Sequence, residues 1–341
     1  MKKLGVLLAV VLFWGLQGLP MVYSQEVIKM KWASPYPITH LTHRHALKYI
    51  ELIHQYTNNR VNIAYFPQEQ LGKAKDLMFV CSQGTADFAQ IHVTYFVGQL
   101  PLNNVIVLPY FTTAAEGTEI YLRLIKTNAE IQNEFLKYNT RVLNVFTTPQ
   151  YDIATVKKPL KKPEDAAGLK LKTAGGMHNI IAQQYKIVPV NIGGVETYES
   201  IQRGIVDGCV FSYPSVKAYR LDELVKYYTL GLRMGAYPAA VIVNEKRWQQ
   251  LPPDVKQGIN KATDEIEKIL GVAWDEEQEK YRKEFERRGI IINPVLPKDR
   301  AMWDAPLKGI EDFWIQDMEK KGLPGKKVFN DFLRIAKEVA K

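Results

Sequence analysis

Short apolar runs and amphipathic stretches alternate along this chain from about residue 27 to beyond residue 230. The run at 27–33 is typical of a buried strand, and the helical spacing of apolar side chains over 41–56 predicts a helix. A second helix is predicted at 73–82, and further strands at 61–65, 88–93, 105–108, 142–146, 169–172, 187–190, 209–211, 227–232 and 239–243. This alternation predicts an α/β fold with mostly parallel sheets.

The length of the chain predicts two lobes. Its 341 residues exceed the size of one ordinary domain, which is about 100 to 200 residues. Two similar segments, 83–88 and 202–208, each end a predicted helix with Gly and enter a strand through Asp. Gly suits a helix end that needs a positive φ, so we expect two lobes of similar construction. From Pro253 an apolar stripe continues toward Arg288 and predicts a helix long enough to brace both lobes.

The N-terminus has the pattern of a secretory signal peptide. Lys2 and Lys3 precede an apolar run over 4–16, and small residues lead to a cleavage point after Ser24. A signal anchor is the alternative, but Gly, Gln and Pro interrupt the run, which is short for a bilayer span of about 20 residues. We therefore expect export, removal of residues 1–24 and no stable membrane insertion of the mature chain.

Charge and cysteine content narrow the class of partner. Removal of the two N-terminal lysines lowers the net charge from +9 to +7, and no basic block with interleaved aromatic residues predicts nucleic-acid binding. Cys81 and Cys209 are the only cysteines and lie far apart in sequence. An oxidising compartment would permit a disulfide, but a bond between lobes that move would be strained, so we expect two buried free thiols.

The segment 168–176 reads as a strand, a Gly turn and the start of a helix. Ligands in open α/β sheets collect beyond the carboxyl ends of strands, and a helix N-terminus favours an anion. Lys172 would add a full positive charge there, with Gly175 at the turn. The alternative is a solvent-facing Lys on an edge strand and glycines that only turn the chain, and these residues alone do not separate the two.

Other candidate side chains fit a binding cleft better than an active site. His40 follows a Pro turn and His92 ends a predicted strand, while His43 and His45 lack the further ligands that a zinc site requires. No nucleophile elbow, metalloprotease, Walker or dinucleotide-binding motif is present, so no catalytic residue, metal or cofactor is predicted. Aromatic residues gather at strand ends and turns, and a subset is expected to wall a ligand pocket.

Five segments, in this order along residues 27 to 260, resemble the solute-binding subunit of tripartite ATP-independent periplasmic (TRAP) transporters. Each is weak alone, but together they are specific. They are Phe66-Pro67-Gln68-Glu69-Gln70-Leu71-Gly72, Gln83-Gly84-Thr85-Ala86-Asp87-Phe88-Ala89, Leu108-Pro109-Tyr110-Phe111, Lys158-Pro159 with 163–171, and Tyr198 with 201–208.

The resemblance implies a periplasmic protein of two α/β lobes, joined by crossing strands and a long helix, that closes over an organic acid. The acid would then pass to membrane permease subunits for uptake driven by an ion gradient. Residues 25–149 and 238–277 would form lobe I, and 150–237 with 278–341 lobe II. Closure would bend the chain around 237–238.

The resemblance also assigns the ligand site and shows where this chain departs from the family. Lys172 stands where the family commonly has Arg, so the charge remains but the bidentate fork is lost. Tyr151 and Asp152 lie near a second family Arg, and Asp152 would favour a ligand with an amine or hydroxyls if it is not simply a surface turn residue. The remaining expected contacts come from both lobes: Phe211, Tyr213, Trp32, His40, His92 and Gln70.

Three other functions use similar features. A binding protein for an ATP-driven importer is disfavoured by the motif set, and an exported hydrolase would need a nucleophile and base that the sequence does not display. A sensing protein that docks on a membrane receptor would have the same fold. Neighbouring genes would separate sensing from transport: two permease genes favour transport, and a kinase gene favours sensing.

Overall fold

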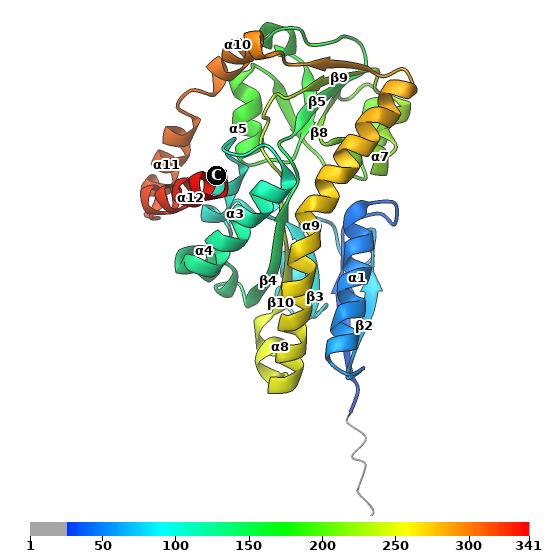
Figure 1. The fold of residues 1–341 in the computed structure, drawn as a ribbon, viewed down its shortest axis with the longest axis vertical. Coiled ribbons are helices and arrows are strands. Elements are labelled where there is room, and N and C mark those ends of the chain that lie inside the picture. Colours follow the sequence, from blue (N-terminus) through cyan, green and yellow to red (C-terminus); the bar gives the residue numbers. More distant parts are fainter. Residues whose placement is uncertain (1–25, 341) are drawn as a thin grey trace, which may run out of the picture.

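Two mixed β-sheets form the centres of two lobes in the computed structural model, which describes residues 26–340 (Figure 1). The first sheet has the strand order β2-β1-β3-β10-β4, and the second β11-β9-β5-β8-β6-β7. The first comprises β1 (Ile28–Ala33), β2 (Val61–Phe66), β3 (Phe88–His92), β4 (Thr140–Thr147) and β10 (Pro238–Asn244). The second comprises β5 (Asp152–Thr155), β6 (Lys170–Thr173), β7 (Val188–Asn191), β8 (Gly208–Phe211), β9 (Tyr227–Leu230) and β11 (Ile291–Pro294).

Each sheet contains one reversed strand, and both reversed strands lie where the chain crosses between lobes. β10 is antiparallel to β3 and β4, and β5 is antiparallel to β8 and β9; the other neighbouring strands in these two sheets are parallel. The chain leaves the first lobe between β4 and β5 and returns between β9 and β10. The α/β, two-lobed architecture with mostly parallel sheets is therefore confirmed.

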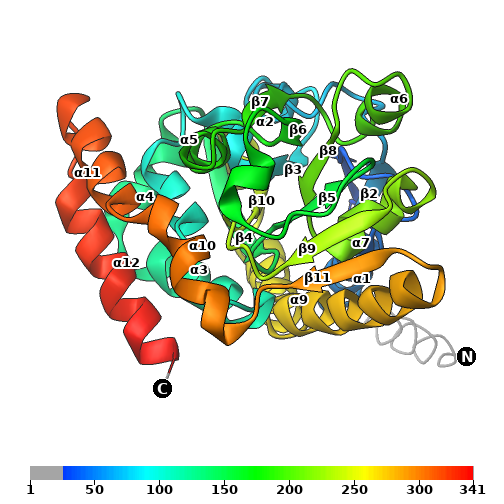
Figure 2. The same cartoon turned by 90° about the horizontal axis from the view of Figure 1, so that it is seen from above.

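Helices cover both sheets and continue past them at the C-terminus (Figure 2). The α-helices other than α9 are α1 (Leu41–Tyr56), α2 (Leu77–Ser82), α3 (Ala114–Thr127), α4 (Ala129–Leu136), α5 (Met177–Gln184), α6 (Thr197–Gln202), α7 (Tyr213–Ala218), α8 (Glu245–Gln250), α10 (Arg300–Asp304), α11 (Ile310–Lys320) and α12 (Gly325–Val339). The 3₁₀ turns are η1 (Val93–Phe96), η2 (Leu102–Val107), η3 (Pro163–Ala166), η4 (Leu221–Glu223), η5 (Pro297–Asp299) and η6 (Ala305–Leu307).

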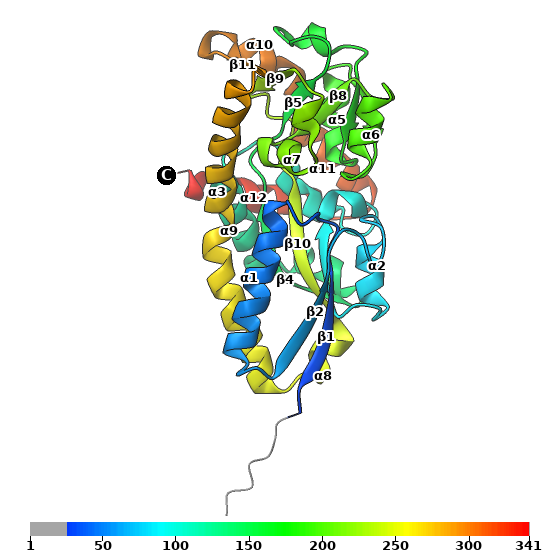
Figure 3. The same cartoon turned by 90° about the vertical axis from the view of Figure 1, so that its right-hand side faces the viewer.

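The helix α9 (Pro253–Arg287) runs 35 residues along both lobes (Figure 3). It packs against α1, α3 and β4 at the first sheet and against α7 and β11 at the second. Its buried stripe includes Val255, Ile259, Ala262 and Ile266, the helical spacing that predicted it. The predicted bracing helix is thus confirmed to within one residue of its end.

The two similar segments, 83–88 and 202–208, have the same structural role in the two lobes. After α2, Gly84 has φ +79°, and after α6, Gly204 has φ +69°. Asp87 then accepts a hydrogen bond from the backbone N–H of Lys31 at 2.7 Å, and Asp207 accepts one from Lys170 at 2.9 Å. In each lobe the aspartate fixes the start of one strand to its neighbour.

Two predicted elements differ from the structure. Residues 105–108 are not a strand, because 102–107 form η2, which the carboxylate of Glu134 caps by accepting from the N–H groups of Leu102 and Asn103. Their apolar side chains are buried all round, so the run resembled a buried strand. The predicted helix at 73–82 begins only at Leu77.

The predicted assignment of residues 278–341 to lobe II stays a prediction, because this segment packs on more than one lobe. α12, which the prediction places in lobe II, packs against α3 and η2 of lobe I. The predicted signal peptide, 1–24, lies outside the described residues. Within 26–340, no helix is long and apolar enough to cross a membrane.

Candidate ligand-binding site

A small cavity of about 20 Å³ lies between the two lobes, about the room that one water molecule needs. Both lobes and both crossing segments contribute to it. Its walls are mainly aromatic, with one Lys, two His and three small residues that bear hydroxyls or no side chain. The lining residues are Tyr36, His40, His92, Tyr95, Phe146, Thr148, Tyr151, Lys172, Gly194, Phe211, Ser215, Tyr219, Tyr237 and Trp274.

Of the residues that the structure describes, Lys172 is the only Lys or Arg on the cavity wall. It lies on β6 between Cys209 of β8 and Val190 of β7, and none of its surface is exposed. Its Nζ has no hydrogen-bond partner and lies 3.7 Å from the centre of the Phe211 ring. Burial lowers the pKa of Lys172 to about 7, because a charged ammonium without water or a counter-ion is unfavourable.

The two histidines of the cavity are held neutral. His40 caps α1, and its Nδ1 accepts from the N–H of Thr42 at 3.2 Å, so its proton is on Nε2. His92 ends β3, with Nδ1 3.2 Å from the hydroxyl of Tyr36. Burial lowers the pKa of His40 to about 3 and that of His92 well below its usual value. Within the described part of the chain, Lys172 is consequently the one side chain on the wall able to carry positive charge near neutral pH.

Two parallel pairs of rings form the aromatic walls. Tyr151 and Tyr237, from the two crossing segments, stack at 5.4 Å with 16° between their planes. Phe211 and Tyr219 stack at 5.7 Å and 15°. The backbone of Gly194 lies against the ring of Tyr219, where any Cβ would clash with it. Because residue 194 has no side chain, the ring of Tyr219 can lie close to the backbone there and leaves more room in the cavity.

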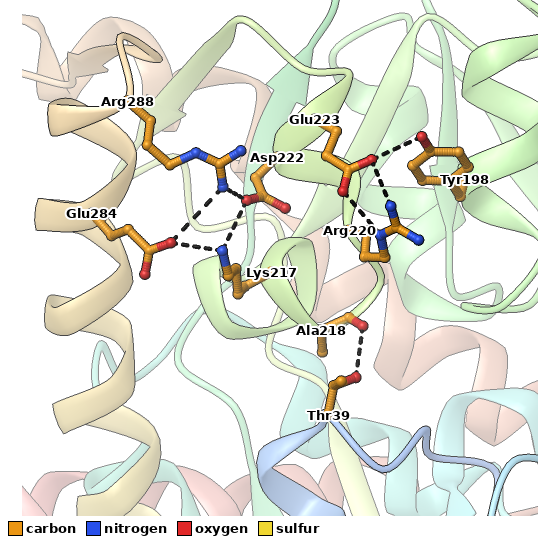
Figure 4. Close-up of polar contacts among 9 residues, drawn as sticks. All are labelled: Thr39, Tyr198, Lys217, Ala218, Arg220, Asp222, Glu223, Glu284 and Arg288. Carbon is orange, nitrogen blue, oxygen red and sulfur yellow. Dashed lines mark hydrogen bonds and ion pairs between the residues drawn. The ribbon is translucent and has the colours of Figure 1, made fainter.

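The helix α7 carries Ser215, and Tyr219 is the residue at its C-terminal end. An ion network ties this helix to the end of α9 (Figure 4). Lys217 contacts Asp222 at 3.2 Å and Glu284 at 2.6 Å, and Arg288 also pairs with Asp222. The side chain of Asp222 is only 3 % exposed, so its charge depends on these two cations.

Hydrogen bonds join the lobes at the mouth of the cavity. The hydroxyl of Thr39, just before α1, donates to the carbonyl of Ala218 at 3.0 Å (Figure 4). Lys75 Nζ donates to the carbonyl of Asn191 at 3.2 Å. These contacts show the lobes closed over the cavity.

Five of the ten side chains predicted at the site line this cavity: Lys172, Phe211, Tyr151, His40 and His92. The other five lie elsewhere. Trp32 is in the core of lobe I, stacked on Phe88 at 5.3 Å, and Tyr213 stacks on Tyr228 at 3.9 Å. Gln70 is exposed.

Asp152 and Gly175 also lie away from the cavity. Asp152 is buried and accepts from the N–H groups of Gly231 and Leu232, so it is neither a surface turn residue nor a wall of this cavity. At Gly175 an added Cβ would meet the side chain of Asn191, and at Gly176 it would meet Val97. The start of α5 therefore packs on the other lobe rather than opening into the cavity.

Sequence reasoning did not single out several lining residues, notably Tyr219, Ser215, Thr148 and Trp274. Trp274 belongs to the buried stripe of α9, where its spacing reads as core. Tyr219 and Thr148 lie in irregular segments with no periodicity.

Among residues 26–340, no group of three His, Cys, Asp or Glu side chains could hold a metal ion. Cys81 and Cys209 are buried free thiols, as predicted.

Comparison with known proteins identifies the family. The family described as bacterial extracellular solute-binding protein, family 7, matches residues 33–317. The C4-dicarboxylate-binding periplasmic protein DctP of Rhodobacter capsulatus is 26% identical over 282 residues, covering 78% of this chain and 80% of that protein. The family match covers all the residues that line the cavity and every strand of the two sheets except most of β1.

Two solved TRAP solute-binding proteins share the fold. One from Rhodoferax ferrireducens, in complex with benzoate, has a TM-score of 0.85 at 18% identity and covers 92% of this chain and 99% of its own. One from Bordetella bronchiseptica, with bound mandelate, has a TM-score of 0.83 at 22% identity and covers the same shares. The chain belongs to the bacterial extracellular solute-binding protein family 7, the family of TRAP solute-binding proteins.

Proposed function

We propose that this protein captures a small organic acid in the cavity between its lobes and delivers it to the membrane permease of a TRAP transporter. The observation that carries the proposal is the ammonium group of Lys172, which is buried with no partner. A buried charge is normally paired, and among the described residues no Asp or Glu lines the cavity. A ligand carboxylate would supply the missing partner.

The relatives are consistent with such a ligand. DctP of Rhodobacter capsulatus is named for C4-dicarboxylates, and the two solved structures hold benzoate and mandelate. Each of these solutes carries a carboxylate. Lys172 can offer a carboxylate charge-assisted hydrogen bonds, each worth about 1.5 to 3 kcal/mol.

The same geometry supports binding without chemical conversion. The groups around Lys172 are aromatic rings, neutral imidazoles and hydroxyls, arranged as walls. The site residues act by contact and by closure of the lobes, with the contact between Thr39 and Ala218 at the mouth. Delivery to a permease, an extracytoplasmic location and cleavage near Ser24 belong to this proposal.

The test is a thermal-shift screen of residues 25–341 against organic acids, amines and sugars, because a ligand specific for the folded state raises its melting temperature. Hits should be carboxylates, and their shifts should disappear in Lys172→Met. Lys170→Met is the matched control, since Lys170 lies two residues earlier on β6 and is exposed. Hits confined to neutral or cationic compounds would sink the proposal.

A further inference from the structure

The charge on the cavity wall limits the ligand to one negative charge. Among residues 26–340, Lys172 is the sole cation that lines the cavity, and both histidines are neutral. Lys75, whose charge also acts on Lys172, is exposed and donates to the carbonyl of Asn191. A second carboxylate on the ligand would lie among aromatic rings without a positive partner, and an unpaired buried charge is strongly unfavourable. The site therefore differs in charge from one built for a dicarboxylate.

The other wall groups indicate what the uncharged part of the ligand is. Eight of the lining residues are Tyr, Phe or Trp, and four of their rings form the two parallel pairs described above. Aromatic rings prefer offset-stacked or edge-to-face contacts with other rings. A flat ring satisfies such walls better than a puckered aliphatic one.

The position of Lys172 places the acid next to that ring. Phe211 covers one side of Nζ at 3.7 Å, so a carboxylate must approach Nζ from the cavity. The ring of Tyr237 is 5.9 Å from the same Nζ, and Tyr237 stacks on Tyr151. The rings of Tyr151 and Phe211 already meet edge to face at 5.8 Å. An acid that carries its ring directly on the carboxyl group, or one carbon away, therefore brings that ring against these walls as the lobes part to admit it.

We propose that this protein selects aromatic monocarboxylates and rejects dicarboxylates. This inference rests on the proposed capture of an organic acid and names its class. Phe211 and Tyr219 are the residues that determine the preference for an aromatic ring, and Lys172 limits the charge.

Calorimetric titration at pH 7 with matched pairs of probe ligands separates the effect of ligand charge on affinity from the effect of ligand shape. Terephthalate and 4-nitrobenzoate have nearly the same shape but two charges and one, and succinate and succinamate form a smaller pair of the same kind. We expect the dianion to bind at least about 100-fold more weakly than its partner in whichever pair fits the cavity. A dianion that binds as tightly as its partner, or more tightly, overturns the limit of one charge.

The ring preference is tested with benzoate against cyclohexanecarboxylate. Benzoate is expected to bind about 2- to 10-fold more tightly, as ring contacts of this kind predict. Phe211→Leu and Tyr219→Leu should reduce that ratio toward one, whereas Tyr198→Leu, a change outside the cavity wall, should leave it unchanged. Equal affinity for the two acids in the unmutated protein overturns the aromatic assignment.

The outcomes also distinguish this inference from the proposed function. If succinate or another aliphatic dicarboxylate binds best, the protein is an organic-acid receptor and only the class is wrong. If no carboxylate in the panel binds, and benzamide or another neutral probe does, capture of an organic acid fails as well.

Discussion

Replacement of Lys172 by Met should affect affinity and stability in opposite directions. Without the ammonium, the ligand carboxylate would be buried with no partner, and removal of one member of a buried pair costs about 3 to 5 kcal/mol. The dissociation constant for a bound carboxylate should rise by roughly 150- to 5,000-fold. Met keeps the unbranched shape, so the walls should stay in place.

The empty protein should become more stable. Burial lowers the pKa of Lys172 from 10.5 to about 7, and each pKa unit corresponds to about 1.4 kcal/mol. Burying this group therefore lowers the stability of the closed form by up to about 5 kcal/mol. Opening of the lobes hydrates Nζ and reduces the gain from Lys172→Met. A rise of several degrees in melting temperature is still expected, since 1 kcal/mol shifts it by roughly 2–4 °C at about this size.

Calorimetric titration and thermal unfolding measure the two effects on the same sample, with Lys170→Met as the control for loss of a surface charge. A variant that melts lower and binds a carboxylate as tightly as the original protein would refute the reasoning. In that case Lys172 would be a structural residue, and the ligand would be held elsewhere.

Three further predictions follow from the same contacts. A bound carboxylate should raise the lowered pKa of Lys172, so binding takes up a proton above pH 7. The affinity should therefore fall by up to about tenfold per pH unit above pH 7. An affinity that does not change from pH 7 to 9 would show that Lys172 is hydrated in the empty protein. Gly194→Ala should push the ring of Tyr219 into the cavity and weaken binding of larger acids more than small ones, measured as the ratio of their dissociation constants. Thr39→Val removes the donor to the Ala218 carbonyl and should favour the open form by about 0.5 to 1.5 kcal/mol. Small-angle scattering should then give a larger radius of gyration for the ligand-bound protein. An unchanged radius of gyration and affinity would mean that this contact does not hold the lobes closed.

Local patterns predicted the parts of the fold that depend on local physics. The helix α9 could be found because its buried side chains recur at helical spacing, and the paired roles of Asp87 and Asp207 could be found because each lobe starts a strand in the same way. The run at 105–108 was misread because a 3₁₀ turn buried on all sides has no period that distinguishes it from a buried strand. The carboxylate that caps it, Glu134, is 31 and 32 residues away in sequence from the two N–H groups that it accepts from.

The site was only half predictable for a related reason. Both faces of a sheet covered by helices are apolar, so strand residues such as Trp32 point into the core or the cavity with no difference in pattern. Lys172 was identifiable because it lies near the end of a strand that a Gly turn and a helix follow, the place where anionic ligands collect. Tyr219 and Thr148 lie in irregular segments, whose place at the cavity depends on how the two lobes close.

We expect the crossing segments to couple closure of the lobes to binding of the ligand. Thr148 and Tyr237 are joined by two hydrogen bonds, from Thr148 N–H to the Tyr237 carbonyl at 3.2 Å and from Tyr237 N–H to the Thr148 hydroxyl at 3.0 Å. The pairing continues where the N–H of Tyr151 donates to the carbonyl of Gly235 and the N–H of Met234 donates to the carbonyl of Tyr151, both at 2.9 Å. Tyr151 and Tyr237 are also the stacked wall of the cavity, so a ligand that packs on these rings touches the segments that we expect to bend when the lobes open. A change of side chain here therefore alters affinity and the equilibrium between open and closed forms together.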